Sequence, residues 1–140
     1  MIVYVESNFV LELAFLQEHH EQCDKIISLA ASRQIDLVIP TISLTEPYET
    51  LTRRARQRSD LQERLTRELR ELSRSEPYSE ISERSRDITA LLVRSGEEEK
   101  GRLDATLGQL LEHCEIIPIG SNTLRAAIAL KESYGLQPQD

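Results

Sequence analysis

The fold is decided by the stretch Met1-Ile-Val-Tyr-Val-Glu-Ser-Asn-Phe-Val-Leu-Glu12. Its apolar run Ile2–Val5 predicts a buried strand, which Glu6 closes. Ser7 and Asn8 are good N-cap residues and lead into a segment with the apolar spacing of a helix. A carboxylate is thereby placed at the carboxyl end of a strand. In open α/β sheets, active sites form at that edge.

Length and composition limit the classes of protein to consider. The 140 residues fit a single domain, 1–140, that can bury a core. No apolar run reaches the length of a membrane span, and the chain starts with a strand rather than a signal peptide. Cys23 and Cys114 lie far apart without metal-binding spacing. We interpret both as reduced core residues, which favours a cytoplasmic protein without a membrane partner.

Arginine is concentrated in one segment of an otherwise acidic chain. The formal net charge is −7, but residues 50–74 hold eight arginines against four acids, or +4, which leaves −11 elsewhere. Arginine binds phosphate in a bidentate manner. The alternative is a solvated helix face with i,i+4 pairs such as Asp60–Arg64 and Glu63–Arg67. We expect phosphate binding, by Arg53, Arg54 and Arg56, only if this helix borders the acidic edge.

The remaining pattern alternates strands with helices. Strands are predicted over Asp36–Pro40 and Glu115–Ile119. Helices are predicted over about Asn8–Leu16, His20–Ser32, Ser43 onward with Glu46 and Pro47 in its first turn, Glu49–Ser75, Ser79–Arg94, Leu103–Cys114 and Thr123–Tyr134.

This order predicts an α/β fold with an incomplete parallel sheet of about three strands. Because Ile2–Val5 is the most apolar strand, we expect it in the middle of the sheet. The residues from about 49 to 113 form an insertion that we expect to fold as a long helical hairpin. Its expected corners are Pro77 and the polar turn Gly96–Gly101.

Three stretches resemble the motifs of PIN-domain nucleases, in order and spacing. Val3–Glu12 resembles the opening strand, acid and helix of that family. Ile39–Glu46 resembles its second motif, a strand followed by a helix that carries a glutamate. Leu130–Asp140 resembles the approach to its third motif, where an acid opens a helix.

The resemblance implies a three-layer PIN-like fold and a function. The expected activity is that of a metal-dependent endoribonuclease of the toxin type, which pairs with an antitoxin protein. Glu6, Glu46 and Asp140 would hold Mg²⁺ or Mn²⁺ and carry the catalysis. Ser7 and Asn8 would contact the RNA substrate.

The chain departs from the family pattern in two places. Glu6 stands where the family usually has Asp, so its carboxylate reaches one methylene further. The sequence also stops at Asp140 in the middle of a motif, and we therefore expect the C-terminal part of the domain to be missing. An incomplete sheet leaves the Ile2–Val5 strand with one unpaired side, from which we expect a homodimer.

Other interpretations stay open. Glu46 could be a first-turn helix acid favoured by the helix dipole, and Asp140 a frayed terminus. The chain could then be an inactive PIN-fold module that binds RNA or protein. A third possibility is an α/β protein that dimerises through its hairpin. That reading predicts self-association through the stripe Leu61, Leu65, Leu69 and Leu72.

Overall fold

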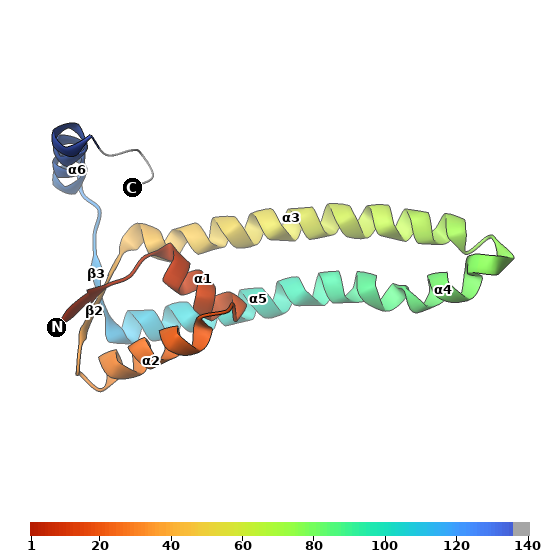
Figure 1. Cartoon of the computed structure of the whole chain (residues 1–140), viewed down its shortest axis with the longest axis horizontal. Helices are drawn as coiled ribbons and strands as arrows, with labels where there is room; N and C mark the ends of the chain where they lie inside the picture. Colours follow the sequence, from red (N-terminus) through yellow and green to blue (C-terminus); the bar gives the residue numbers. More distant parts are fainter. Residues whose placement is uncertain (136–140) are drawn as a thin grey trace.

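A long helical hairpin projects from a small parallel sheet (Figure 1). The structure, a computed structural model, describes residues 1–135, except for the side chain of Arg86. Its elements follow the predicted alternation: β1 Ile2–Tyr4, α1 Ser7–Phe15, α2 His20–Ala31, β2 Asp36–Pro40, α3 Thr41–Leu72, a 3-10 helix Glu76–Tyr78, α4 Ser79–Arg84, α5 Arg86–His113, β3 Cys114–Ile117 and α6 Ser121–Tyr134. The fold is mostly helical and broadly α/β, with the expected hairpin insertion.

The sheet has the strand order β1-β2-β3, and both pairings are parallel. The prediction that the first strand lies in the middle is wrong, because β2 occupies that place. β1 is short and exposes Ile2 and Tyr4, whereas Leu37 to Pro40 of β2 are all buried. The most buried of the three strands is therefore β2 and not β1. β1 lies at an edge and, within residues 1–135, has one unpaired side.

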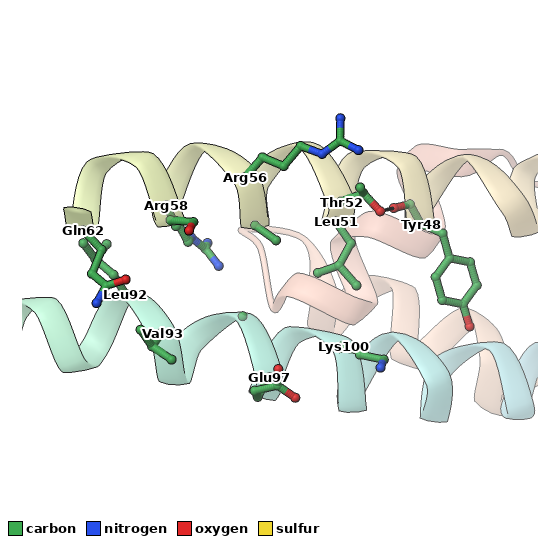
Figure 2. A pocket seen from close by; sticks show the side chains of 13 residues that line it. Tyr48, Leu51, Thr52, Arg56, Arg58, Gln62, Leu92, Val93, Glu97 and Lys100 are labelled. Carbon is green, nitrogen blue, oxygen red and sulfur yellow. Dashed lines mark hydrogen bonds between the residues drawn. The ribbon is translucent and has the colours of Figure 1, made fainter. Parts of the chain in front are cut away.

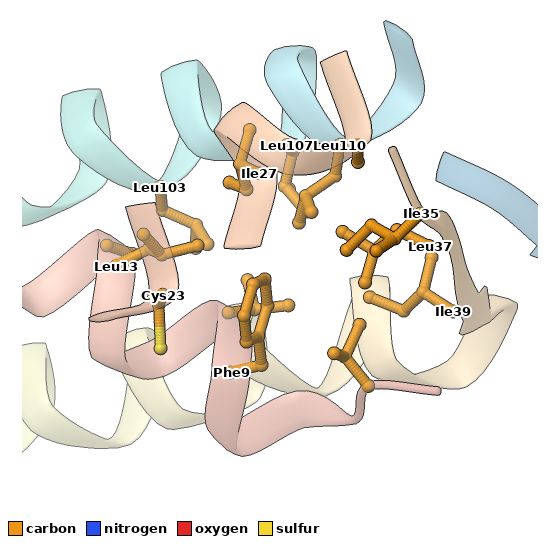
Figure 3. Packing of buried hydrophobic residues seen from close by; sticks show 14 of the residues in the cluster. Phe9, Leu13, Cys23, Ile27, Ile35, Leu37, Ile39, Leu103, Leu107 and Leu110 are labelled. Carbon is orange, nitrogen blue, oxygen red and sulfur yellow. The ribbon is translucent and has the colours of Figure 1, made fainter. Parts of the chain in front are cut away.

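One face of the sheet carries the core (Figure 3). Leu37 and Ile39 of β2, Phe9 of α1, and Leu103 and Leu110 of α5 belong to one buried cluster. Val10, Leu37, Ile39, Leu103 and Leu110 are almost completely buried. On the other face, Ile2 and Tyr4 remain exposed. Within the described residues, helices cover the sheet on one face only. α6 stands apart beyond the end of β3, with no buried residue (Figure 1).

Helix α3 starts earlier than the sequence pattern predicts. It begins at Thr41, directly after β2, so Glu46 and Pro47 lie in the second turn rather than the first. Pro47 lacks the N–H that an interior helical position would donate. Its ring is completely buried beside buried Ser43, and this packing offsets the lost hydrogen bond. Because Glu46 is not in the first turn, the helix dipole does not explain its position.

The prediction of a second hairpin corner at Gly96–Gly101 is wrong. Pro77 lies in the short 3-10 helix at the hairpin tip, as expected. Gly96 and Gly101, however, lie inside the continuous helix α5. Neither glycine has a positive φ. The residues between them, Glu-Glu-Glu-Lys, are good helix formers, and one of them, Glu99, is held by Arg58 of α3 through two hydrogen bonds of 2.8 Å. Tertiary contacts thus override the two glycines.

Both cysteines are free, and only Cys114 differs in position from the prediction. Cys23 is buried on α2, as expected. Cys114 is half-buried and opens β3 rather than ending a helix. Its burial raises the pKa of the Cys114 thiol from 9.0 to about 11. The pKa of the Cys23 thiol is also raised, first by burial and then by the charges of Glu12 and Asp24.

Candidate functional site at the carboxyl edge of the sheet

The ends of β1 and β2 bring the first two predicted acids to the same edge. Glu6 follows β1 and forms the N-cap of α1, so α1 starts at Ser7, one residue earlier than its predicted start at Asn8. Glu46 lies in the second turn of the helix that follows β2. The Ser7 hydroxyl donates a hydrogen bond to the Glu46 carboxylate. Residues 39 positions apart in the sequence therefore meet at this edge.

Glu6 has its own local partner. The Asn8 side-chain amide donates to the Glu6 carboxylate at 3.2 Å. The two pairs, Ser7 with Glu46 and Asn8 with Glu6, lie next to each other along the chain, and we name these four residues the edge site. Both carboxylates and the Asn8 side chain are exposed to solvent, and Ser7 is half-buried. The edge site is therefore open to solvent over the part of the chain that the structure describes.

A hydrogen bond also joins the ends of β2 and β3 at this edge. The Thr41 hydroxyl, on the first residue of α3, donates to the Ile117 carbonyl at the end of β3 at 3.1 Å. This contact fixes the start of α3 against β3 and so fixes the position of Glu46. Sequence analysis did not single out Thr41. Its position directly after a buried strand, like that of Ser7 after β1, was the available signal.

The edge site falls short of a three-carboxylate cluster over the part of the chain that is described. Within residues 1–135, no three His, Cys, Asp or Glu side chains gather closely enough to hold a metal ion. The third predicted acid, Asp140, lies outside the described residues. The donor set at hand is two carboxylates, one hydroxyl and one amide, all of which offer oxygen. Oxygen ligands are what Mg²⁺ and Mn²⁺ prefer, and Mg²⁺ often takes only one or two carboxylates and keeps several waters.

The three predicted substrate-binding arginines do not share one environment. Arg53 lies seven residues after Glu46, which is close to two helical turns, so it occupies the same side of α3 about 10 Å further along. Arg53 and Arg56 form no ion pair within the described residues. Arg54 instead lies over the Phe15 ring, 4.3 Å from its centroid. Its stacking helps to hold α1 against α3.

A groove of about 600 Å³ runs between α3 and α5 (Figure 2). Its floor is largely apolar, with Leu51, Ala55 and Leu92, and Arg56 and Lys100 bring positive charge to its edges. Near one end, the Tyr48 hydroxyl donates to Asp104 at 2.6 Å, and this hydrogen bond raises the pKa of Tyr48. The groove is separate from the edge site, since Glu6, Ser7 and Glu46 do not line it.

The strongest ion pair of the hairpin was missed by sequence analysis. Arg58 and Glu99 are joined by two hydrogen bonds of 2.8 Å between α3 and α5, and Glu99 is buried. The pKa of Arg58 is raised, chiefly by its hydrogen bond to Glu99. A signal was present, because Arg58 lies seven residues after Leu51 and seven before Leu65, in line with the inward leucines. A charge at such a position needs a partner.

Comparison of the chain with protein-family models, with curated proteins and with solved structures gives no significant match. Among the described residues, no helix has both the length and the apolar composition of a membrane-spanning segment. The functional argument therefore rests on the residues of the edge site and their surroundings.

Proposed function

We propose that the chain is a PIN-like, metal-dependent endoribonuclease whose active site is built around the edge site. One observation carries the proposal: Glu46, which follows β2, accepts a hydrogen bond from Ser7, the residue next to Glu6 after the neighbouring parallel strand β1. Parallel strands followed by acids at a shared edge are the arrangement that the resemblance to PIN domains implies. The three-layer architecture of that family belongs to the proposal too.

The chemistry follows from the donor set. A divalent cation, Mg²⁺ or Mn²⁺, would lower the pKa of a bound water and offset charge on the phosphate. Glu6 and Glu46 would hold the cation, with Asp140 as the third carboxylate. Ser7 positions the Glu46 carboxylate, and Asn8 positions that of Glu6. Oriented carboxylates lose less conformational freedom when they bind a cation.

The proposed substrate is RNA, bound through its phosphates along the outer side of α3. Arg53 supports this assignment because it lies on the side of α3 that carries Glu46 and has no ion pair within the described residues. Arg56 lies further along and has none either. Arg54 is less suited, since its guanidinium already stacks on Phe15. An antitoxin partner remains a prediction from the family resemblance.

A cleavage assay tests the proposal. A single-stranded RNA with a fluorophore and a quencher should be cut in the presence of Mg²⁺ or Mn²⁺ and left intact in EDTA. Glu6→Gln and Glu46→Gln should each abolish cleavage, because they remove a negative charge from the cation site. Asp60→Asn, an exposed acid on the same helix, is the matched control and should cut at the wild-type rate. Equal rates for all three variants would refute the proposal.

The second candidate function is that of an inactive PIN-fold module that binds RNA. The specific observation in its favour is that the described residues supply two carboxylates at the edge site rather than three. This function predicts RNA binding that weakens with salt but no cleavage. Arg53→Ala together with Arg56→Ala should then weaken binding and flatten its salt dependence, whereas Arg54→Ala should act mainly on stability.

A further inference from the structure

One side of the hairpin contacts helix α1 near the sheet. Arg102 of α5 donates from Nε to the Ala14 carbonyl at 3.0 Å. Arg54 of α3 lies over the Phe15 ring. These two contacts mark the side of the α3–α5 pair that α1 covers. The cover stops where α1 ends, at Phe15, while both long helices continue toward the tip (Figure 1).

The same side of the hairpin continues as an apolar strip. On α3, Leu61 and Leu72 follow Arg54 by 7 and 18 residues, close to two and five helical turns. On α5, Leu91 and Ile88 precede Arg102 by 11 and 14 residues, close to three and four turns. All four side chains therefore lie on the side that α1 covers at the base. We name these residues the distal strip: Leu61, Leu72, Ile88 and Leu91.

The distal strip is open to solvent. Its side chains are between 44% and 53% exposed. Leu65 and Leu69, which the sequence pattern grouped with them, turn inward and are half-buried. Between residues 52 and 102, no apolar side chain is buried. Two helices alone thus leave the distal half of the hairpin without a core, and exposed apolar side chains on one side of it favour a contact with another molecule.

We propose that the distal strip is a contact between two copies of this chain, with helix α3 antiparallel to the partner's α3. A two-fold axis that crosses α3 between Thr66 and Arg67 places Leu61 opposite the partner's Leu72, because 61 and 72 are equidistant from it. Arg64 then lies beside the partner's Glu68. Each contact is formed twice, as a two-fold interface requires.

The charges decide the direction and favour a second copy as the occupant. A parallel pairing would place Arg64 beside the partner's Arg64 and Glu68 beside its Glu68, and like charges repel. The antiparallel pairing puts opposite charges together at both places. Both residues of each proposed contact are present in this chain, so a second copy can form every contact without any other protein. Ile88 and Leu91 complete the interface from α5 and give a four-helix arrangement.

Sedimentation of the full chain at micromolar concentration tests the proposal. The wild-type chain should be a dimer. Leu61→Asp and Leu91→Asp should each be monomeric, because they place a carboxylate in the apolar contact. Val93→Asp is the matched control, since Val93 is 56% exposed on α5 but lines the groove on the opposite side. It should remain a dimer. Circular dichroism should show the wild-type helix content in all three variants.

A mixing experiment identifies the partner residues. Arg64→Glu and Glu68→Arg should each raise the dimer dissociation constant about tenfold, because two attractive pairs become repulsive. An equimolar mixture of the two variants should form heterodimers of wild-type affinity, since every contact is again between opposite charges. Changes within one helix cannot produce this rescue.

Three results would overturn the proposal: a wild-type chain that sediments as a monomer, a Val93→Asp variant as disrupted as Leu61→Asp, or a mixture no tighter than the single variants. A dimer that survives Leu61→Asp and Leu91→Asp would also overturn it and would point to the open edge of β1 instead. The surface lies apart from Glu6 and Glu46, so the nuclease assay and this test can fail independently.

Discussion

The base and the distal half of the hairpin are built from the same two helices but are held together differently. At the base, Leu51 of α3 and Leu103, Leu107 and Leu110 of α5 are buried against the sheet and α1. In the distal half, the seam holds half-buried leucines and polar residues, and the distal strip faces solvent. Amphipathic helices gain most of their stability from packing. The difference shows that hydrophobic packing within one chain holds the base around the edge site, whereas the distal half has no comparable apolar core of its own.

The largest expected effect comes from comparing one substitution in each half of the hairpin, both on α5. Leu103→Ala should lower the free energy of unfolding by about 2–5 kcal/mol, because it opens a cavity in a fully buried position. Leu91→Ala, measured at a concentration where the chain is monomeric, should change it by no more than about 0.5 kcal/mol. Urea denaturation measures both. A comparable loss for Leu91→Ala would show that the distal half is packed within a single chain.

The junction between the halves gives a smaller effect. Arg58→Ala leaves the buried Glu99 carboxylate without its partner and should cost about 1–3 kcal/mol. The double variant Arg58→Met with Glu99→Leu should lie within about 1 kcal/mol of wild type or above it, since an apolar pair needs no desolvation of charge.

Arg67→Ala, which breaks the exposed pair with Glu63, is the control and should cost less than about 0.5 kcal/mol. If the double variant is as unstable as Arg58→Ala alone, the ion pair itself stabilises the fold, beyond each charge cancelling the burial cost of the other.

A pH-dependent effect concerns the thiol at the base. The pKa of Cys114 is raised to about 11 in the folded chain from 9.0, so between these values the unfolded chain loses a proton that the folded chain keeps. The free energy of unfolding should therefore decrease as pH rises from about 9 to about 11. Cys114→Ala should reduce this decrease. Urea denaturation over that pH range measures it, and an identical slope in both proteins would contradict the assignment.

The sequence predicted much of the framework because apolar periodicity reports burial directly. The strand Asp36–Pro40 was located to the residue, since four consecutive apolar positions there are buried. The corner at Pro77 followed from the geometry of proline. Glu6 and Glu46 were expected at one edge because the carboxyl ends of parallel strands share it, but the hydrogen bond between Ser7 and Glu46 was not predicted.

The errors arose where tertiary contacts outweigh local preference. The pattern around Gly96 and Gly101 predicted a turn. Arg58 of α3 instead pairs with Glu99 and holds the segment between the two glycines in α5. β1 looked most apolar by composition, yet burial depends on neighbours on both faces, and Ile2 and Tyr4 have none on theirs within the described residues. The inward Arg58 was overlooked because a charge in an apolar stripe was read as part of a solvated face.

The most direct test of the central claim, that the edge site holds a divalent cation, is the melting temperature as a function of Mn²⁺ concentration. Binding to the folded chain alone should add about 2.7 kcal/mol of stability at a concentration one hundred times the dissociation constant, and the melting temperature should rise accordingly. Glu6→Gln and Glu46→Gln should lose this rise, while Asp60→Asn keeps it. A wild-type chain whose melting temperature does not respond to Mn²⁺, or a rise that persists in both glutamine variants, would contradict the claim.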